Sequence, residues 1–211
     1  MYKCILLDVD GTILNSLNLY SRIAKEKFSV TDDELASKLR GVISEGGAAL
    51  FATIFGKTFF DNSDINLFRN SQSDCLDVVN DFYVSPNELF KIVSSSSLKI
   101  AFVSNKPATI ISSIFTKTDL KGVDFGIFGL DGPYLPKPSP EHVLYAVSEM
   151  GFFPEDCLFV GDSVFDFIAA DQANVDFGYA SWGYGPKPSI ESNFKFYFEN
   201  PITFVEYLQL L

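Results

Sequence analysis

The chain has 211 residues, of which 47% are hydrophobic, and its formal net charge is −11. This length allows one large domain, or one domain with a small insert. A surface this acidic argues against nucleic acids and anionic membranes as partners, although a small anionic substrate remains compatible with it. No apolar run approaches the roughly 20 residues of a membrane span, and we recognise no secretory signal, so we expect a cytoplasmic protein.

The first predicted element is a short buried strand at residues 4–7, which is apolar and too short for a helix. Asp8 and Asp10 follow it directly, in the run Asp8-Val9-Asp10-Gly11-Thr12. Because side chains alternate along an extended chain, both carboxylates point to the same side. Adjacent carboxylates repel, which raises the pKa of one of them unless a cation neutralises the pair. This costly arrangement indicates a chemical role.

A helical pattern follows, from about Leu17 to Val84, with no convincing strand. Residues 31–34 have the spacing of a capping box and predict a helix start. Gly46 and Gly47 are predicted to open another helix, and residues 65–82 to form a longer one. We therefore expect a helical insert at residues 16–83, which interrupts a domain formed by residues 1–15 and 84–211.

After Pro86 the pattern changes to alternating helices and strands. The predicted strands are at 99–103, 125–128, 157–160, 177–181 and 194–198. The predicted helices begin at 86 or cover 108–115, 139–150, 165–173 and 202–211. Such alternation implies right-handed crossover units and a parallel sheet. The expected fold class is α/β, with a doubly wound, Rossmann-like parallel sheet core and an inserted small α-helical cap.

Four groups of polar residues are predicted at the ends of strands, and in a parallel sheet these ends converge on one edge. Together they offer carboxylates for a hard divalent cation, a hydroxyl and backbone N–H groups for an oxyanion, and one ammonium. Phosphoryl transfer needs these parts. The groups are Asp8 with Asp10, Ser104 with Asn105 and Lys106, Lys137 alone, and Asp162 with Ser163 and Asp166.

These four motifs, in this order, resemble those of the haloacid dehalogenase superfamily of aspartyl phosphohydrolases, in particular its phosphoglycolate-phosphatase-like branch. The resemblance covers essentially the whole chain. It implies a Mg²⁺-dependent phosphatase that acts on a small phosphorylated metabolite through an aspartyl-phosphate intermediate. The roles that it implies are a nucleophile (Asp8), an acid and base (Asp10), phosphate-binding residues (Ser104, Asn105 and Lys137), support of the first loop (Thr12), and Mg²⁺ ligands (Asp8, Asp10, Asp162 and Asp166, the last in direct contact or one step removed).

Two positions depart from related families. Asn15 precedes Ser16 where this branch often has Asp. The position is near the hinge of the expected cap, so we expect an effect on closure of the cap or on substrate preference. Tyr20 stands where a sugar-phosphate mutase of the β-phosphoglucomutase type has His, which weakens the mutase interpretation. A phosphomutase and a non-catalytic binding protein on the same scaffold are the alternatives.

The remaining predictions concern residues outside these motifs. Arg40 could meet an anionic substrate tail or simply end a surface helix, and residues 182–185 could border the site or turn the chain. We expect His142 on a helix surface. The three cysteines, Cys4, Cys75 and Cys157, are unclustered and are expected to be free thiols, buried in the case of the two strand residues. Nothing indicates an obligate interface, so we expect a monomer or weak dimer.

Overall fold

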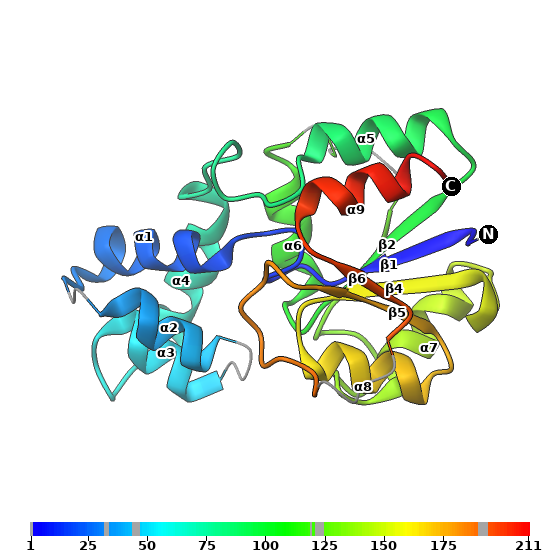
Figure 1. Ribbon diagram of the computed structural model, residues 1–211. Helices are drawn as coiled ribbons and strands as arrows, with labels where there is room; N and C mark the ends of the chain where they lie inside the picture. Colours follow the sequence, from blue (N-terminus) through cyan, green and yellow to red (C-terminus); the bar gives the residue numbers. More distant parts are fainter. Residues whose placement is uncertain (1, 32–33, 44–46, 119, 121–124, 190–193) are drawn as a thin grey trace.

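A parallel sheet forms the centre of the computed structural model, which describes residues 2–31, 34–43, 47–118, 120, 125–189 and 194–211 (Figure 1). Its six strands follow the order β3-β2-β1-β4-β5-β6. They are β1 (Cys4–Leu7), β2 (Lys99–Val103), β3 (Gly126–Phe128), β4 (Cys157–Gly161), β5 (Asp176–Ala180) and β6 (Phe196–Phe198). Neighbouring strands are all parallel, so the predicted doubly wound α/β class is confirmed. The order reverses at β1, and in such sheets the crevice beyond this reversal is where ligands bind.

Helices cover both faces of the sheet, because the strand side chains alternate between two apolar cores. Ile5 and Leu7 of β1 belong to the core beneath α5 (Pro86–Ser95), α6 (Ala108–Phe115) and α9 (Pro201–Leu208). Cys4 and Leu6 belong to the core beneath α7 (Pro140–Glu149) and α8 (Val164–Gln172). Figure 1 shows α5 and α9 above the sheet and α7 and α8 below it. A single 3-10 turn, Pro154–Asp156, leads into β4.

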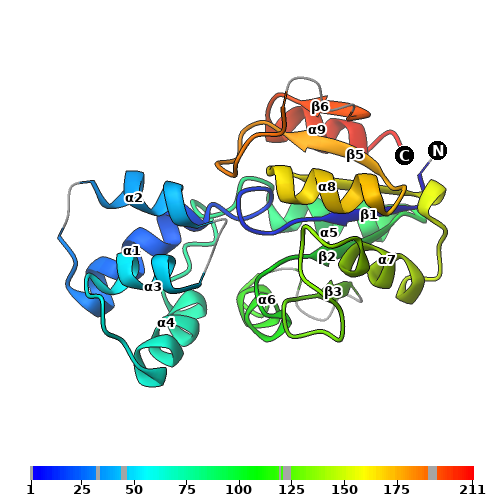
Figure 2. The same ribbon diagram turned by 90° about the horizontal axis from the view of Figure 1, so that it is seen from below.

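Four further helices lie beside the sheet rather than over it (Figures 1 and 2). They are α1 (Ser16–Phe28), α2 (Leu35–Val42), α3 (Gly47–Phe55) and α4 (Asn62–Asp74), and we refer to residues 16–83 as the insert. Its interior is rich in aromatic rings. Phe51 contacts Phe55, Phe60 and Phe68 at ring-centre distances of 5.7, 5.6 and 5.9 Å. Contacts of this kind bury large apolar surfaces, which stabilises a helical unit without strands.

The predicted bounds of the insert helices need correction. The long helix expected at residues 65–82 begins earlier and ends at Asp74. It begins earlier because Asp61 caps it, accepting hydrogen bonds from the backbone of Ser63 and Asp64. It ends early because the chain turns at Asp77, whose side chain accepts the backbone N–H groups of Val79 and Asn80. Two of the residues in the expected start at 31–34, residues 32 and 33, lie outside the described residues, as does Gly46.

An ion pair between a half-buried arginine and a buried aspartate fixes the base of the insert. Arg22 of α1 donates two hydrogen bonds to the Asp81 carboxylate, at 2.7 and 2.8 Å, and one to the Cys75 carbonyl, at 2.5 Å. Asp81 is fully buried. Its backbone carbonyl accepts the N–H of Asn15 at 2.6 Å, and Tyr83 N–H donates to the carbonyl of Ile13 at 2.8 Å. The chain entering the insert is therefore hydrogen-bonded to the chain leaving it.

The second half of the chain follows the predicted elements closely, and the largest difference is the last helix, which ends at Leu208. The three cysteines are free and buried, as expected for the two strand residues, which lie side by side in the register of β1 and β4. Among the described residues, no helix is both long and apolar enough to cross a membrane.

Candidate active site

The predicted motifs meet around one cavity of about 380 Å³ at the carboxyl ends of the central strands. The register pairs Leu7 with Phe102 of β2 and with Val160 of β4, so the three strands end nearly level. The polar residues that follow them are therefore brought together. Residues from the predicted site that line this cavity are Asp8, Asp10, Ser104, Asn105, Lys137, Asp162 and Asp166.

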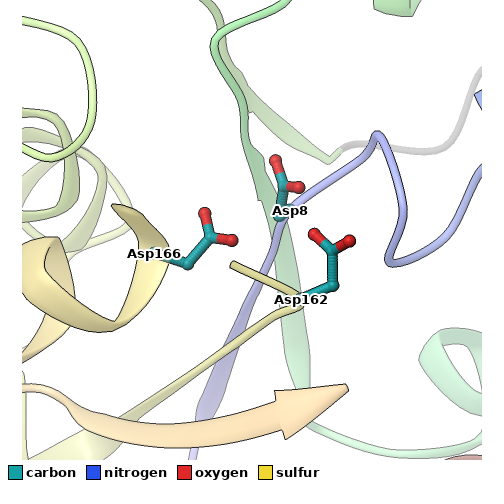
Figure 3. A group of neighbouring side chains, drawn as sticks. All are labelled: Asp8, Asp162 and Asp166. Atoms are coloured by element: carbon teal, nitrogen blue, oxygen red, sulfur yellow. The ribbon is translucent and has the colours of Figure 1, made fainter. Parts of the chain in front are cut away.

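Three buried carboxylates form the centre of this site. Asp8, Asp162 and Asp166 each offer an oxygen, and these oxygens lie within 4.8 Å of one another. Figure 3 shows the three side chains converging from the end of β1, the end of β4 and the start of α8. Burial raises the pKa of Asp8 to about 7, and the neighbouring Asp166 and Asp10 add to this against the opposing effect of Lys137. The pKa of Asp162 is also raised well above its usual range, by burial and then by Asp8 and Asp166.

Lys137 provides part of the compensating charge. Its ammonium lies 2.7 Å from Asp8 Oδ1 and 2.5 Å from Asp166 Oδ1. Burial opposes its charge, but the two carboxylates outweigh burial and the net effect is a raised pKa. Asn105 holds the backbone of this lysine: its amide donates to the Lys137 carbonyl at 2.9 Å and its oxygen accepts the Lys137 N–H at 3.0 Å. Both polar atoms of the Asn105 side chain are thus used to position the Lys137 backbone.

Asp166 is held by the helix that it begins. Ser163 caps α8, and Asp166 Oδ2 accepts both the Ser163 N–H, at 3.0 Å, and its hydroxyl, at 2.6 Å. With Oδ1 paired to Lys137, both of its oxygens are engaged. Asp166 therefore aims the Lys137 ammonium as much as it offers a ligand atom.

The loop after β5 holds Asp162. The N–H groups of Tyr184 and Gly185 donate to Asp162 Oδ2 at 2.9 and 2.8 Å. Two glycines make room for this carboxylate: a Cβ at Gly11 would lie 2.1 Å from Asp162 Oδ2, and one at Gly183 would lie 2.2 Å from Asp162 Cβ. Gly11 also has φ of +93°, which favours glycine. Residues 183–185 therefore border the site, and Trp182 donates to the Thr12 carbonyl at 3.0 Å.

Lys106 is a site residue to which the sequence analysis assigned no role, although it named it beside Ser104. It is buried and lines the cavity, and its ammonium contacts Asp10 Oδ1 at 3.1 Å. It also donates to the Tyr20 hydroxyl at 2.6 Å and to Gln72 Oε1 at 2.7 Å. The site thus has two ammonium groups rather than one. The available signal was its place at the end of β2, two residues after Ser104.

The remaining predicted residues take distinct places. Asp10 accepts a hydrogen bond from the Ser16 hydroxyl in addition to its contact with Lys106. Ser104 is buried, and its hydroxyl accepts the Lys106 N–H at 3.2 Å. Thr12 is buried outside the cavity lining, and among the described residues its hydroxyl has no partner, so its carbonyl rather than its hydroxyl joins the first loop to Trp182.

The structure also tests the predictions for two residues outside the motifs, His142 and Arg40. The expectation that His142 lies on a helix surface is wrong: it is fully buried, stacks on Tyr134 at 4.3 Å and bonds through Nε2 to the Phe128 carbonyl at 3.0 Å. Since a carbonyl only accepts, Nε2 carries the hydrogen. Arg40 is exposed in the last turn of α2 and does not line the cavity, whereas Arg69 of α4 does.

The donor set fits a hard divalent cation. Four carboxylates (Asp8, Asp10, Asp162 and Asp166) face two ammonium groups (Lys106 and Lys137), which leaves an excess of negative charge. Burial is the main cause of the raised pKa values of Asp8 and Asp162, and the neighbouring carboxylates raise them further, as such an excess requires. All available ligand atoms are oxygens, which Mg²⁺ prefers, and a bound cation would relieve the repulsion.

Comparison with known proteins identifies the family. The model of the haloacid dehalogenase-like hydrolases matches residues 5–180. The chain belongs to this family. The match extends from β1 to β5, so it contains all of the predicted site residues, from Asp8 to Asp166.

Individual relatives cover nearly the whole chain. A phosphoglycolate phosphatase of Colwellia psychrerythraea is 24% identical over 195 residues, which are 86% of this chain and 85% of that protein. An N-acetylmuramic acid 6-phosphate phosphatase of Pseudomonas putida is 26% identical over 191 residues, 86% and 84% of the two chains. The crystal structure of a predicted phosphoglycolate phosphatase from Haemophilus somnus has a TM-score of 0.76 at 22% identity, and the match covers 99% of this chain and 98% of that one. The predicted resemblance to the phosphoglycolate-phosphatase-like branch is confirmed, and the chain is a hydrolase.

Proposed function

We propose that this hydrolase is a Mg²⁺-dependent phosphatase that cleaves a small phosphate monoester through an aspartyl-phosphate on Asp8. The observation that carries the proposal is the buried Asp8 carboxylate, 2.7 Å from the Lys137 ammonium and clustered with Asp162 and Asp166 on the cavity wall. The phosphatases among its relatives support the same reaction class.

Asp8 and Asp162 would hold the metal together with the Asp10 backbone carbonyl. Asp166 has both oxygens engaged with Lys137 and Ser163, which favours a supporting place behind the metal. When bound, Mg²⁺ would neutralise the carboxylates and stabilise charge on the phosphoryl oxygens. It would also favour the ionised form of Asp8, whose pKa burial otherwise raises to about 7.

The protein groups account for both chemical steps. An Asp8 oxygen attacks phosphorus, the bond from phosphorus to the ester oxygen breaks, and protonated Asp10 gives its proton to the departing alcohol. Asp10 then takes a proton from a water molecule that attacks phosphorus, and the bond to Asp8 breaks to release phosphate. Ser16 and Lys106 orient the Asp10 carboxylate for these transfers.

The phosphoryl oxygens need donors that remain free. Lys137 uses two of its three N–H groups on Asp8 and Asp166, which leaves one for the substrate. The Ser104 hydroxyl accepts from Lys106 N–H and so has its own hydrogen to donate. Asn105 would contribute by fixing the Lys137 backbone.

The insert would act as the predicted cap, because its residues Phe51, Phe68 and Gln72 line the same cavity as Asp8. Closing the insert over the site would exclude bulk water from the aspartyl-phosphate, and opening would release products. We propose a small phosphorylated metabolite as the substrate, a cytoplasmic location, and a monomer or weak dimer that binds neither nucleic acid nor membrane. A phosphomutase is less well supported, because the Tyr20 hydroxyl stands where a mutase needs His and accepts from Lys106.

The deciding experiment measures phosphate release from a panel of phosphate monoesters that includes phosphoglycolate and N-acetylmuramic acid 6-phosphate, with Mg²⁺ and with EDTA. We expect release that requires Mg²⁺, is lost in Asp8→Asn and persists in Asp171→Asn, an exposed aspartate of α8. Release that survives in Asp8→Asn would refute the nucleophile. Absence of release from every ester, with isomerisation on addition of a sugar bisphosphate, would indicate the mutase.

A further inference from the structure

The cavity extends well beyond the carboxylates, towards the insert. At about 380 Å³ it falls in the range of roughly 300–1,000 Å³ that is typical of pockets for whole small molecules. Its outer walls are apolar and come from both regions of the chain. They include Leu50, Phe51 and Phe68 of the insert. Leu130 and Phe165, which belong to the part of the chain that forms the sheet and its covering helices (the sheet domain), also line them. A short polar leaving group would leave most of these walls without a contact.

Neither lysine can serve a distant charge on the substrate. The Lys106 ammonium has three N–H groups and three acceptors within 3.1 Å, namely Asp10, Tyr20 and Gln72. These bonds also engage the Tyr20 hydroxyl oxygen and the Gln72 carbonyl oxygen. Lys137 lies between Asp8 and Asp166, at the phosphoryl end. The Lys106 ammonium is thus fully engaged with protein groups, and the remaining N–H of Lys137 serves the phosphoryl end.

Arg69 is the cation left over. It lines the cavity and forms no ion pair or hydrogen bond with another side chain in the part of the chain that the structure describes. It precedes Gln72 by three residues on α4, so the two share a face of the helix, one turn apart. Gln72 contacts Lys106, so Arg69 lies about one helical turn along α4 from a residue that contacts this lysine.

An aromatic wall accompanies this arginine. Phe68, its neighbour in sequence, is buried and meets the Tyr20 ring edge-on at 5.0 Å and the Phe51 ring at 5.9 Å. These packed rings offer a fixed apolar surface next to a flexible side chain that ends in a planar guanidinium. Guanidinium binds carboxylates through two parallel hydrogen bonds, which gives both charge and direction.

We propose that the alcohol released from the substrate has an apolar, ring-sized body that packs on Phe51 and Phe68, and a carboxylate that Arg69 binds. This rests on the proposed phosphatase function and narrows its substrate class. The phosphoryl group occupies the carboxylate end, the body crosses the apolar walls, and the acid reaches α4. Glycolate has a carboxylate but only one methylene to place against these walls, so phosphoglycolate fills the subsite poorly.

Three esters of comparable primary alcohols test the subsite: 4-carboxybenzyl phosphate, benzyl phosphate and phosphoglycolate. We expect kcat/KM to be highest for 4-carboxybenzyl phosphate, by about tenfold over benzyl phosphate, as one charge-assisted contact supplies. Arg69→Gln should remove this ratio. Arg40→Gln, the matched change at an exposed arginine of α2 that does not line the cavity, should preserve it. A ratio that is unchanged in Arg69→Gln, or a preference for phosphoglycolate, would overturn the inference.

A binding measurement separates this inference from the reaction itself. Calorimetry of the Asp8→Asn protein should give about tenfold tighter binding of 4-carboxybenzyl phosphate than of benzyl phosphate, and addition of Arg69→Gln should abolish the difference. Equal affinities for the two esters in Asp8→Asn would refute the subsite. Selective binding in Asp8→Asn without phosphate release by the unmodified protein would support the subsite and refute the phosphatase.

Discussion

The carboxyl edge of the sheet and the helical insert are stabilised by different interactions. At the edge, buried charged side chains form ion pairs with one another, as Lys137 does with Asp8 and Asp166. In the insert, rings such as Phe51 and Phe68 pack on one another, and the Arg22–Asp81 ion pair lies at its base. A buried charge without its partner is costly, whereas apolar side chains exchange with modest loss. The edge therefore depends on particular residues and the insert on shape.

The largest predicted effect is at the edge. Asp162→Asn should reduce Mg²⁺-dependent phosphate release by about 10³-fold or more, since a bound metal contributes several kcal/mol to the transition state. The change keeps the size of the side chain and its bonds to Tyr184 and Gly185. Initial rates over a Mg²⁺ titration measure it, with Asp171→Asn as the control. Normal rates at the usual Mg²⁺ concentration would remove Asp162 from the metal site.

The next effect is on stability and tests the base of the insert. Arg22→Met leaves the buried Asp81 carboxylate without its cation, so the free energy of unfolding should fall by about 3–5 kcal/mol. Urea unfolding at neutral pH measures this, and Lys91→Met, at an exposed lysine of α5, should change little. Equal stability of the two variants would mean that the ion pair is not what holds the insert.

A pH effect follows from His142, the single histidine of the chain. Burial, and then Lys137, lower its pKa from 6.5 to about 4 in the folded protein. Between these values the unfolded chain binds a proton that the folded protein excludes, so this residue should reduce stability by about 3 kcal/mol as the pH falls from 7 to 4. Unfolding of His142→Gln over this range should show a loss that is smaller by that amount. Parallel pH curves for the two proteins would contradict it.

The smallest predicted effect joins the two regions. Lys106→Met removes contacts to Asp10, Tyr20 and Gln72 at once, and a hydrogen bond to a charged group contributes about 1.5–3 kcal/mol. We expect kcat to fall by about 10–100-fold. Lys99→Met, at the exposed start of the same strand, is the matched control. An unchanged kcat would mean that the contacts of Lys106 with the insert do not affect the acid and base function of Asp10.

The sheet and most of the edge could be predicted because their signals are local. Apolar runs followed by Asp8, Ser104 or Asp162 indicate where each strand ends, and the parallel pairing of the strands then brings these ends together. The residues that were missed depend on contacts distant in sequence. Lys106 has its partners on α1 and α4, and the backbone groups that hold the predicted Asp162 lie after β5, so no spacing rule indicates these contacts. His142 shows the same limit, because helical periodicity alone does not say that Tyr134 covers it.

The insert was recognised as helical, but the bounds of its fourth helix were not predicted correctly. Asp77 ends α4 by an arrangement of side chain and backbone that competes with the helix, and a hydrophobic pattern that continues to Phe82 hides this turn. Arg40 was the arginine considered from the sequence, and Arg69 was not, since only the packing of α4 brings Arg69 to the cavity.

The two crossings between insert and sheet domain have a mechanical consequence. Residues 13–15 and 81–83 run side by side, joined by hydrogen bonds from Asn15 to Asp81 and from Tyr83 to Ile13, and Leu14 forms an antiparallel bridge with Phe82. Because the two connecting segments are hydrogen-bonded to each other, they would favour rotation of the insert about one axis over free rotation about several axes. In the closure that we propose, rotation about a single axis would bring Phe51 and Phe68 back to the same place over Asp8 each time.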